Sequence, residues 1–166
     1  MKIAIISDIH DNVVNMNKAI DFIKKEGAEM IIFCGDLCAP SVLKEMAKNF
    51  PGQIHLVFGN VDGDHYLSAK MEKDFKNIKI YNDLGEIEID GKKFAFIHFP
   101  KIAQGLAKSG KYDLVFYGHN HKPWEEKVGK CILANPGTLG GLFYHASFAL
   151  YDTKINKLEL KILDQI

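Results

Sequence analysis

Carboxylate, amide and imidazole side chains recur in this sequence where short apolar segments end. The first case is Asp8-Ile9-His10, directly after the isoleucine-rich segment of residues 2–7. A carboxylate oxygen and an imidazole nitrogen two residues apart can bind one transition-metal ion together. Alone, Asp8 could instead be the N-cap of a following helix. The residues that repeat the pattern further along the chain are Asp36, Asn60, His98, His119 and His121.

The number and type of these side chains favour two metal ions over one. A single ion takes up to about six ligands, bound waters included. A structural zinc site would use cysteine thiolates, and the three cysteines of the chain are not spaced with the histidines in that way. Oxygen and imidazole ligands suit Mn, Fe, Co, Ni or Zn better than Ca. We therefore expect two divalent transition-metal ions as cofactors, with manganese as the first candidate.

Apolar strands that alternate with helices would bring these side chains together. The predicted buried strands are residues 2–7, 30–34, 54–58 and 114–117. Between the first two, Val13, Met16, Ile20 and Ile23 recur at helical spacing, and Gly27 ends that helix. A strand, a helix and a strand in this order predict a right-handed parallel crossover. Ligands of such sheets bind outside the carboxyl ends of the strands, so we expect the polar residues to converge on one rim.

The remaining segments add helices and antiparallel strands. Asp90-Gly91 between two alternating segments predicts a hairpin. Asn135-Pro136-Gly137-Thr138 predicts a turn between two later strands. The further predicted helices are residues 40–50, 67–75 and 102–108, and the further predicted strands are residues 78–80, 85–89, 93–97, 124–127, 131–134, 147–151 and 158–163.

Size and composition indicate one globular domain spanning residues 1–166, of which 47% are hydrophobic. With 21 basic and 21 acidic residues the chain is formally neutral, so we expect no stable nucleic-acid binding, which depends on neutralising phosphates. No apolar segment approaches the roughly 20 residues of a membrane span. Three cysteines with no paired framework, and a first strand without a leader before it, predict a reduced, cytoplasmic protein.

Taken together, five motifs resemble those of the calcineurin-like metallophosphoesterases. They are Asp8-x-His10, Gly35-Asp36, Gly59-Asn60, His98 and Gly118-His119-x-His121, in the order of that family. The chain length and the Gly59-Asn60-Val61-Asp62 variant are most similar to the small prokaryotic phosphodiesterases of the family. The resemblance implies an α/β fold of two facing mixed β-sheets flanked by helices, an α/β/β/α sandwich with a dinuclear metal site on its rim.

The resemblance also assigns the ligands to two sets. The set of the first metal is Asp8, His10 and His121. The set of the second metal is Asn60, His98 and His119. Asp36 would bridge the two ions.

The mechanism that the resemblance implies is hydrolysis of a phosphodiester by a hydroxide that bridges the two metals. Two ions about 4 Å apart can lower the pKa of that nucleophile and hold the attacking and leaving oxygens in line. The residues with implied catalytic roles are Asp8, Asp36, Asn60 and His98. Those with implied substrate contacts are Asn12, Asn60 and His98, and the alternative for Asn12 is a helix cap.

Two positions depart from the family pattern. The family often has a histidine after the Gly-Asn pair, where it can protonate the leaving group, and this chain has Val61. The family often has a glycine after the fourth-motif histidine, and this chain has Phe99-Pro100. These departures concern the acid catalyst and the shape of the substrate site, and leave the metal ligands unaffected.

Other functions remain open from sequence alone. A phosphomonoesterase acting on nucleotides or phosphoproteins would need the same metals. A non-catalytic interaction module resembling the retromer subunit of this fold would have lost part of the metal site, whereas this chain has a ligand at each position. We expect a small phosphodiester or nucleotide-like substrate and no membrane partner. The monomer and a homo-oligomer are both open as the oligomeric state.

Several nearby residues have two interpretations. Asp62 and Asp64 could support a metal-bound histidine or lie in a surface turn. His65 could approach the substrate from its loop. Cys38, two residues after Asp36, could be redox-sensitive or inert. We expect the phenylalanines and Trp124 to be core residues.

Overall fold

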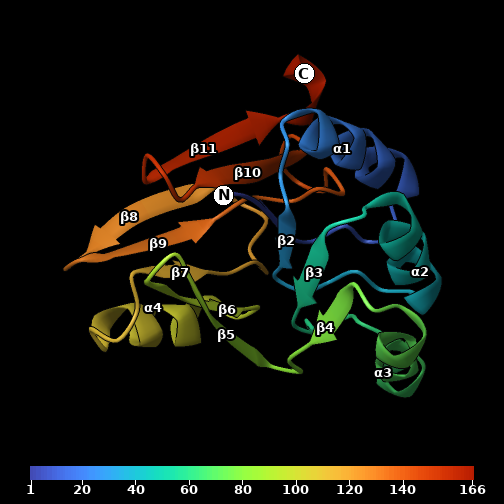
Figure 1. The fold of residues 1–166 in the computed structure, drawn as a ribbon, viewed down its shortest axis with the longest axis horizontal. Coiled ribbons are helices and arrows are strands. Elements are labelled where there is room, and N and C mark those ends of the chain that lie inside the picture. The colour runs from blue at the N-terminus through green and yellow to red at the C-terminus, as the bar shows by residue number, and fades with distance from the viewer.

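Two β-sheets pack face to face and helices cover both outer faces (Figure 1). The structure, a computed structural model, describes residues 1–166. The six-stranded sheet contains, in spatial order, β11 (Lys157–Ile162), β10 (Ser147–Asp152), β1 (Lys2–Ile6), β2 (Met30–Phe33), β3 (Gln53–Leu56) and β4 (Ile78–Ile80). The five-stranded sheet contains β5 (Leu84–Ile89), β6 (Lys92–Ile97), β7 (Leu114–Phe116), β9 (Cys131–Asn135) and β8 (Trp124–Val128).

The helices lie on opposite sides of this pair of sheets. The structure has α1 (Val13–Lys25), α2 (Pro40–Asn49), α3 (His65–Asp74), α4 (Pro100–Lys108) and a last 3₁₀ turn (Leu163–Gln165). In Figure 1, α1, α2 and α3 follow the six-stranded sheet at the right, and α4 lies beside β6 and β7 at the left. The predicted α/β/β/α sandwich is thus confirmed. No helix combines the length and the apolar character needed to cross a membrane.

Three apolar layers hold the sandwich together. The first joins α1 and α2 to the six-stranded sheet and includes Met16, Phe33 and Leu43. The second lies between the sheets, where Ile5 of β1 and Phe94 of β6 belong to the same cluster. The third joins α4 to the outer face of the five-stranded sheet. Buried apolar surface stabilises a fold in proportion to its area, so each sheet is stabilised on both faces.

The carboxyl ends of several parallel strands lie at one rim of the sandwich. β1, β2, β3 and β4 are parallel, as predicted from the strand and helix order. β6 and β7 are also parallel.

The antiparallel character predicted for the last part of the chain is only partly right. β8 pairs antiparallel with β9, and β10 pairs antiparallel with β1 and β11. β9, however, pairs parallel with β7. The cause is the tight β8–β9 hairpin, which reverses the chain so that β9 returns in the direction of β7.

The turn predicted at residues 135–138 begins a passage between the two sheets. The chain leaves β9 in one sheet and enters β10 in the other. On the way, the backbone N–H of Leu139 donates to Ser7 O, and that of Gly140 donates to Asp8 O, both at 2.9 Å. This segment is therefore attached to the chain just after β1, beside the first predicted metal ligand.

Candidate metal centre

The loops after β1 and β2 run side by side past the ends of their strands. The N–H of Asp8 donates to Gly35 O at 2.9 Å, and the N–H of His10 donates to Asp36 O at 3.1 Å. Ladder-like pairing thus continues for several residues beyond the sheet. It brings the side chains of Asp8, His10 and Asp36 to one place, as the strand order predicts.

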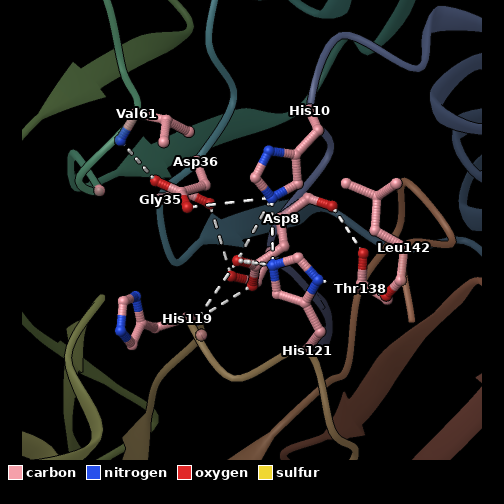
Figure 2. Close-up of polar contacts among 12 residues, drawn as sticks. Asp8, His10, Gly35, Asp36, Val61, His119, His121, Thr138 and Leu142 are labelled. Carbon is pink, nitrogen blue, oxygen red and sulfur yellow. Dashed lines mark hydrogen bonds and ion pairs between the residues drawn. The ribbon is translucent and has the colours of Figure 1, made fainter. Parts of the chain in front are cut away.

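One group of side chains forms around the buried carboxylate of Asp8 (Figure 2). His121 Nε2 lies 3.2 Å from Asp8 Oδ1 and 3.1 Å from His10 Nε2. One potential ligand atom from each of Asp8, His10, Asp36 and His121 lies within 4.8 Å of the others. Four lone-pair donors at this separation can surround one divalent ion.

A second group forms around Asn60. Its Oδ1 lies 2.8 Å from His119 Nδ1 and 3.1 Å from His98 Nε2. Those two imidazole nitrogens are 3.3 Å apart. In Figure 2 the ring of His119 points away from the Asp8, His10 and His121 group. The structure therefore brings the seven predicted ligands together as two groups, with the same members that the family resemblance implies.

Asp36 lies between the two groups. Its Oδ2 is 3.3 Å from His98 Nε2 and 3.9 Å from His10 Nε2, while its Oδ1 accepts the N–H of Val61 at 3.0 Å. Burial, the largest single influence, would raise the pKa of Asp36. The hydrogen bond and charge of His98, the Val61 N–H and the charge of His10 together outweigh burial and lower that pKa. The Asp36 carboxylate thus remains ionised between the groups.

Backbone carbonyls determine which nitrogen two of the histidines offer. His98 Nδ1 donates to Cys34 O at 2.8 Å, and His121 Nδ1 donates to Leu142 O at 3.2 Å. A carbonyl oxygen can only accept, so Nδ1 carries the proton in each neutral ring. The lone pair of Nε2 then faces the site, which is the arrangement of metal-binding histidines with an outer hydrogen-bond partner.

Two of the candidate histidines, His10 and His98, are biased towards protonation by nearby carboxylates. The carboxylate of Asp8, 3.8 Å from His10 Nε2, and the charge of Asp36 raise the pKa of His10 against the effect of burial. For His98, burial is the largest influence and lowers the pKa, but the hydrogen bond and charge of Asp36 and the charge of Asp8 together raise it. Side chains that favour binding protons without a metal ion can bind a metal cation in place of those protons.

Backbone strain is concentrated at the site. Five of the seven candidate ligands have a positive φ: Asp8 (54°), His10 (48°), Asp36 (61°), His119 (75°) and His121 (58°). This region costs an L-residue roughly 1–2 kcal/mol, and such conformations cluster at functional sites. The fold therefore orients these side chains at a cost in stability, which points to a role other than packing.

Two motif glycines are required by close contacts around the carboxylates. A Cβ on Gly59 would lie 2.1 Å from Asp36 Oδ1, and a Cβ on Gly118 would lie 2.7 Å from Asp8 Oδ2. Any side chain at either position would displace a candidate ligand. The glycines of Gly59-Asn60 and Gly118-His119 thus belong to the site because of the space they leave.

Asp62 connects the loop after β2 with the loop after β3. Its Oδ1 accepts the N–H of Leu37 at 2.6 Å and of Cys38 at 2.8 Å. Its Oδ2 accepts the N–H of Asp36 at 3.0 Å and of Gly59 at 2.6 Å. A carboxylate that accepts four backbone donors fixes the relative position of Asp36 and the Gly59-Asn60 pair.

The donor set fits divalent transition metals. It consists of carboxylate and amide oxygens and imidazole nitrogens, with no thiolate among the converging atoms. Asp8, Asp36, His98 and His121 are buried, whereas Asn60 and His119 are exposed. The second group thus forms the side of the site that solvent and a substrate can reach.

The sequence comparison identifies the family of this site. A model of the calcineurin-like phosphoesterase superfamily domain matches residues 1–156. The chain belongs to this superfamily. Phosphodiesterase MJ0936 of Methanocaldococcus jannaschii is 37% identical over 143 residues, which cover 85% of this chain and 86% of that protein. The predicted family is therefore confirmed.

The calcineurin-like fold also agrees with solved structures. The structure of an archaeal phosphodiesterase superposes with a TM-score of 0.91 at 33% identity, covering 98% of this chain and 99% of that one. Vps29 of Entamoeba histolytica superposes with a TM-score of 0.69 at 17% identity, covering 98% and 99% of the two chains. The second likeness concerns the fold alone.

Some predicted site residues have other observed contacts. Asn12 Oδ1 accepts the N–H of Asn15 at 3.1 Å, and its Nδ2 donates to Gly140 O at 3.0 Å. Both polar atoms of the Asn12 amide thus form hydrogen bonds: the oxygen caps α1, and the nitrogen binds the segment of residues 138–142. Its contact with substrate stays a prediction.

Neither His65 nor Cys38 belongs to either ligand group. The His65 ring stacks on Phe58 with centroids 3.9 Å apart. Cys38 Sγ lies 3.7 Å from His10 Nδ1. Burial and the carboxylates of Asp11, Asp62, Asp36 and Asp8 raise the pKa of this thiol to about 11. A protonated thiol is a weak nucleophile, so the inert interpretation is the one that the surroundings favour.

Sequence reasoning missed the supporting contacts. It left the role of Asp62 open, although its place two residues after Asn60 was the available signal. It had no signal for the carbonyls of Cys34 and Leu142, because backbone groups are identical at every residue. The rings of Phe99, Trp124 and Phe143 were expected in the core, yet they are 38%, 48% and 90% exposed.

Proposed function

We propose that this protein is a metal-dependent phosphodiesterase. One observation carries the proposal most directly: Asp36 Oδ2 lies between His98 Nε2 and His10 Nε2, one member of each ligand group. A shared carboxylate is what a pair of adjacent metal ions needs. The relatives named as phosphodiesterases, MJ0936 above all, support the diester as substrate.

The proposed ligands keep the assignment of the family resemblance. Asp8, His10 and His121 would hold one ion, Asn60, His98 and His119 the other, and Asp36 both. Bound divalent metals would supply an activated water as nucleophile and would neutralise the developing charge on the phosphate. We propose manganese as the native metal, with Ni, Fe, Co and Zn as the other candidates.

The chain's own groups would prepare the site for that chemistry. The lowered pKa of Asp36 keeps its carboxylate negative at neutral pH. The carbonyls of Cys34 and Leu142 hold the Nδ1 protons of His98 and His121, so both rings keep a free lone pair towards the ions. The exposed amide of Asn60 would contact the incoming phosphate group.

The cellular setting is also proposed. Cys34, Cys38 and Cys131 are free thiols, which is typical of proteins from reducing compartments. We therefore propose a cytoplasmic enzyme acting on a small phosphodiester or a nucleotide-like compound.

The test is a comparison of esters before and after metal removal. Protein stripped with a chelator and reloaded with Mn²⁺ should cleave bis(p-nitrophenyl) phosphate faster than p-nitrophenyl phosphate, and the stripped protein should cleave neither. Asp36→Asn should be inactive. Asp21→Asn is the matched control, because Asp21 is a surface carboxylate of α1 that pairs only with Lys24 at 3.0 Å.

The alternatives give different results in the same assay. Faster cleavage of the monoester would identify a phosphomonoesterase. If neither ester is cleaved with Mn, Ni, Fe, Co or Zn, the proposal is overturned. The protein would then be interpreted as a non-catalytic module.

A further inference from the structure

An exposed aromatic ring lies beside the histidines of the second ligand group. The Phe99 ring centroid is 5.2 Å from that of His98 and 5.3 Å from that of His119. Phe99 is the N-cap of α4, and Pro100 follows it as the first helical residue. Pro100 fixes its own φ and restricts the residue before it to extended backbone. The backbone that carries the Phe99 ring is therefore conformationally restricted, next to the solvent-accessible side of the site.

A second exposed ring lies beside the first ligand group. Phe143 is 90% exposed, and its ring centroid is 5.4 Å from that of His121. Its φ is +67°, which is unfavourable for a bulky side chain. An apolar ring that is exposed and also held in a strained backbone gains little from packing, so its position points to a role in function.

The segment that carries Phe143 is anchored to the metal centre. Thr138 Oγ1 and the N–H of Gly140 both donate to Asp8 O at 2.9 Å. Leu142, one residue before Phe143, accepts the Nδ1–H of His121. Figure 2 shows Thr138 and Leu142 beside Asp8 and His121. The Phe143 ring is thus held in relation to the first ligand group as Phe99 is to the second.

We propose that Phe99 and Phe143 are specificity-determining residues that select phosphodiesters with flat, apolar ester groups. This inference rests on the proposed diesterase function. A diester carries an organic group on each side of its phosphorus atom, and each ligand group has one ring beside it. An aryl group or a nucleobase would stack on such a ring, whereas a methyl group would not, and a monoester has only one organic group to offer. Aromatic pairs have geometric preferences and add affinity beyond their buried area.

The experiment keeps the leaving group constant and varies the other ester group. The substrates are methyl, phenyl and thymidine-5′ esters of p-nitrophenyl phosphate, assayed with the Mn²⁺-loaded protein. Because the same p-nitrophenolate leaves each time, its pKa cannot cause a difference. Wild type should prefer the phenyl and thymidine esters over the methyl ester by about 3- to 10-fold in kcat/KM, mainly through KM.

Variants then assign the preference to the rings. Because p-nitrophenyl occupies one ring in every substrate, one of Phe143→Ala and Phe99→Ala should abolish the preference and the other should lower kcat/KM about 3- to 10-fold for all three esters alike. The double variant should show both effects. Phe143→Leu keeps an apolar side chain without a flat face and should behave like Phe143→Ala. Ile155→Ala is the matched control, because Ile155 is 67% exposed in the β10–β11 turn, at the far end of the sheet from Asp8.

A binding measurement complements the rates. Diphenylphosphinate and dimethylphosphinate have carbon–phosphorus bonds and are not hydrolysed. Calorimetry should show tighter binding of the diphenyl compound by about 3- to 10-fold in wild type and no difference in the double variant.

The outcomes separate this inference from the function beneath it. Wild type that cleaves all three esters at the same kcat/KM, or a folded double variant that keeps the preference, would overturn the role of the rings and leave the diesterase intact. Wild type inactive on all three esters would refute the diesterase itself.

Discussion

Removing the carboxylate of Asp62 should damage both the stability and the metal centre. Asp62→Ala would take away the acceptor of four backbone N–H groups, those of Asp36, Leu37, Cys38 and Gly59. Asp36 and Leu37 are buried, with 2% and 5% of their surface exposed. Water can replace the lost partner at the half-exposed Cys38 and Gly59 more easily than at the two buried residues.

The two buried donors set the expected magnitude. An unsatisfied buried donor costs about 1–3 kcal/mol, so two of them amount to about 4 kcal/mol. For a domain of this size each kcal/mol shifts Tm by roughly 2–4 °C, which gives a decrease of about 8–16 °C. Because the loops carrying Asp36 and Asn60 then lose three of the hydrogen bonds between them, we also expect manganese affinity to fall by about 10- to 100-fold, as for other partners of metal ligands.

The assay combines thermal unfolding of the metal-free protein with calorimetric titration of Mn²⁺. Asp64→Ala is the control, since Asp64 lies two residues further on and only caps α3, by accepting the N–H of Leu67 at 2.9 Å. It should lose about 1 kcal/mol and keep normal metal binding. Asp62→Asn retains one acceptor oxygen and should fall between the wild type and Asp62→Ala.

Two results would refute the reasoning. One is an Asp62→Ala protein that melts within about 2 °C of wild type, because its buried donors would then have other partners. The other is a destabilised variant whose manganese affinity equals that of the Asp64→Ala control, because Asp62 would then support the fold without positioning the ligands.

Four further predictions concern the ions and the chemistry. Asp36→Asn should bind fewer than two ions per chain with high affinity and lose turnover; a variant with two tightly bound ions and full activity would exclude the bridge. EDTA should abolish activity and lower Tm while leaving the far-UV dichroism intact, because the apolar layers form without metal; loss of secondary structure would contradict this. Val61 cannot protonate a leaving group, and a general acid contributes about 10²–10⁴ in rate. The kcat of wild type should therefore depend steeply on the pKa of the leaving group, and Val61→His should flatten that dependence. A flat dependence in wild type would reveal another acid. In metal-free protein at pH 8, iodoacetamide should react with Cys38 about 200-fold more slowly than with free cysteine, because the raised pKa of Cys38, about 11, leaves little thiolate. The reaction rate should rise up to about pH 11, and Cys38→Ala should identify the reacting thiol. A plateau near pH 8 would refute the raised pKa.

The sequence predicted the fold well because its signals are local and repeated. Isoleucine-rich strands such as residues 2–7 alternate with helices whose apolar residues follow helical spacing, and this order implies parallel crossovers. Such signals describe each segment and its immediate connection. They do not specify which strands become neighbours across longer separations, so the parallel pairing of β9 with β7 and the passage of residues 136–146 between the sheets were not predictable.

The candidate ligands were predictable for a related reason. Parallel strands end at the same rim, so polar residues after strands such as β1, β2 and β7 must meet there. The arrangement of the rim was not predictable. The positive φ of Asp8 and Asp36, for example, depends on backbone pairing between two loops, and the exposure of Phe143 depends on how the 138–142 segment is anchored.

The origin of the ligands explains why the metals should affect the whole fold. Asp8, His10, Asp36 and Asn60 follow strands of the six-stranded sheet, whereas His98, His119 and His121 follow strands of the five-stranded sheet. Each ligand group mixes the two, since His121 meets Asp8 and His98 meets Asn60. An ion held by the proposed ligands would therefore link one sheet to the other at the rim, in addition to the apolar layer between them. Ion removal should loosen this edge before it affects either sheet, and hydrogen exchange in metal-free protein should increase first at residues 118–121 and 138–142, while β1 and β6 stay protected.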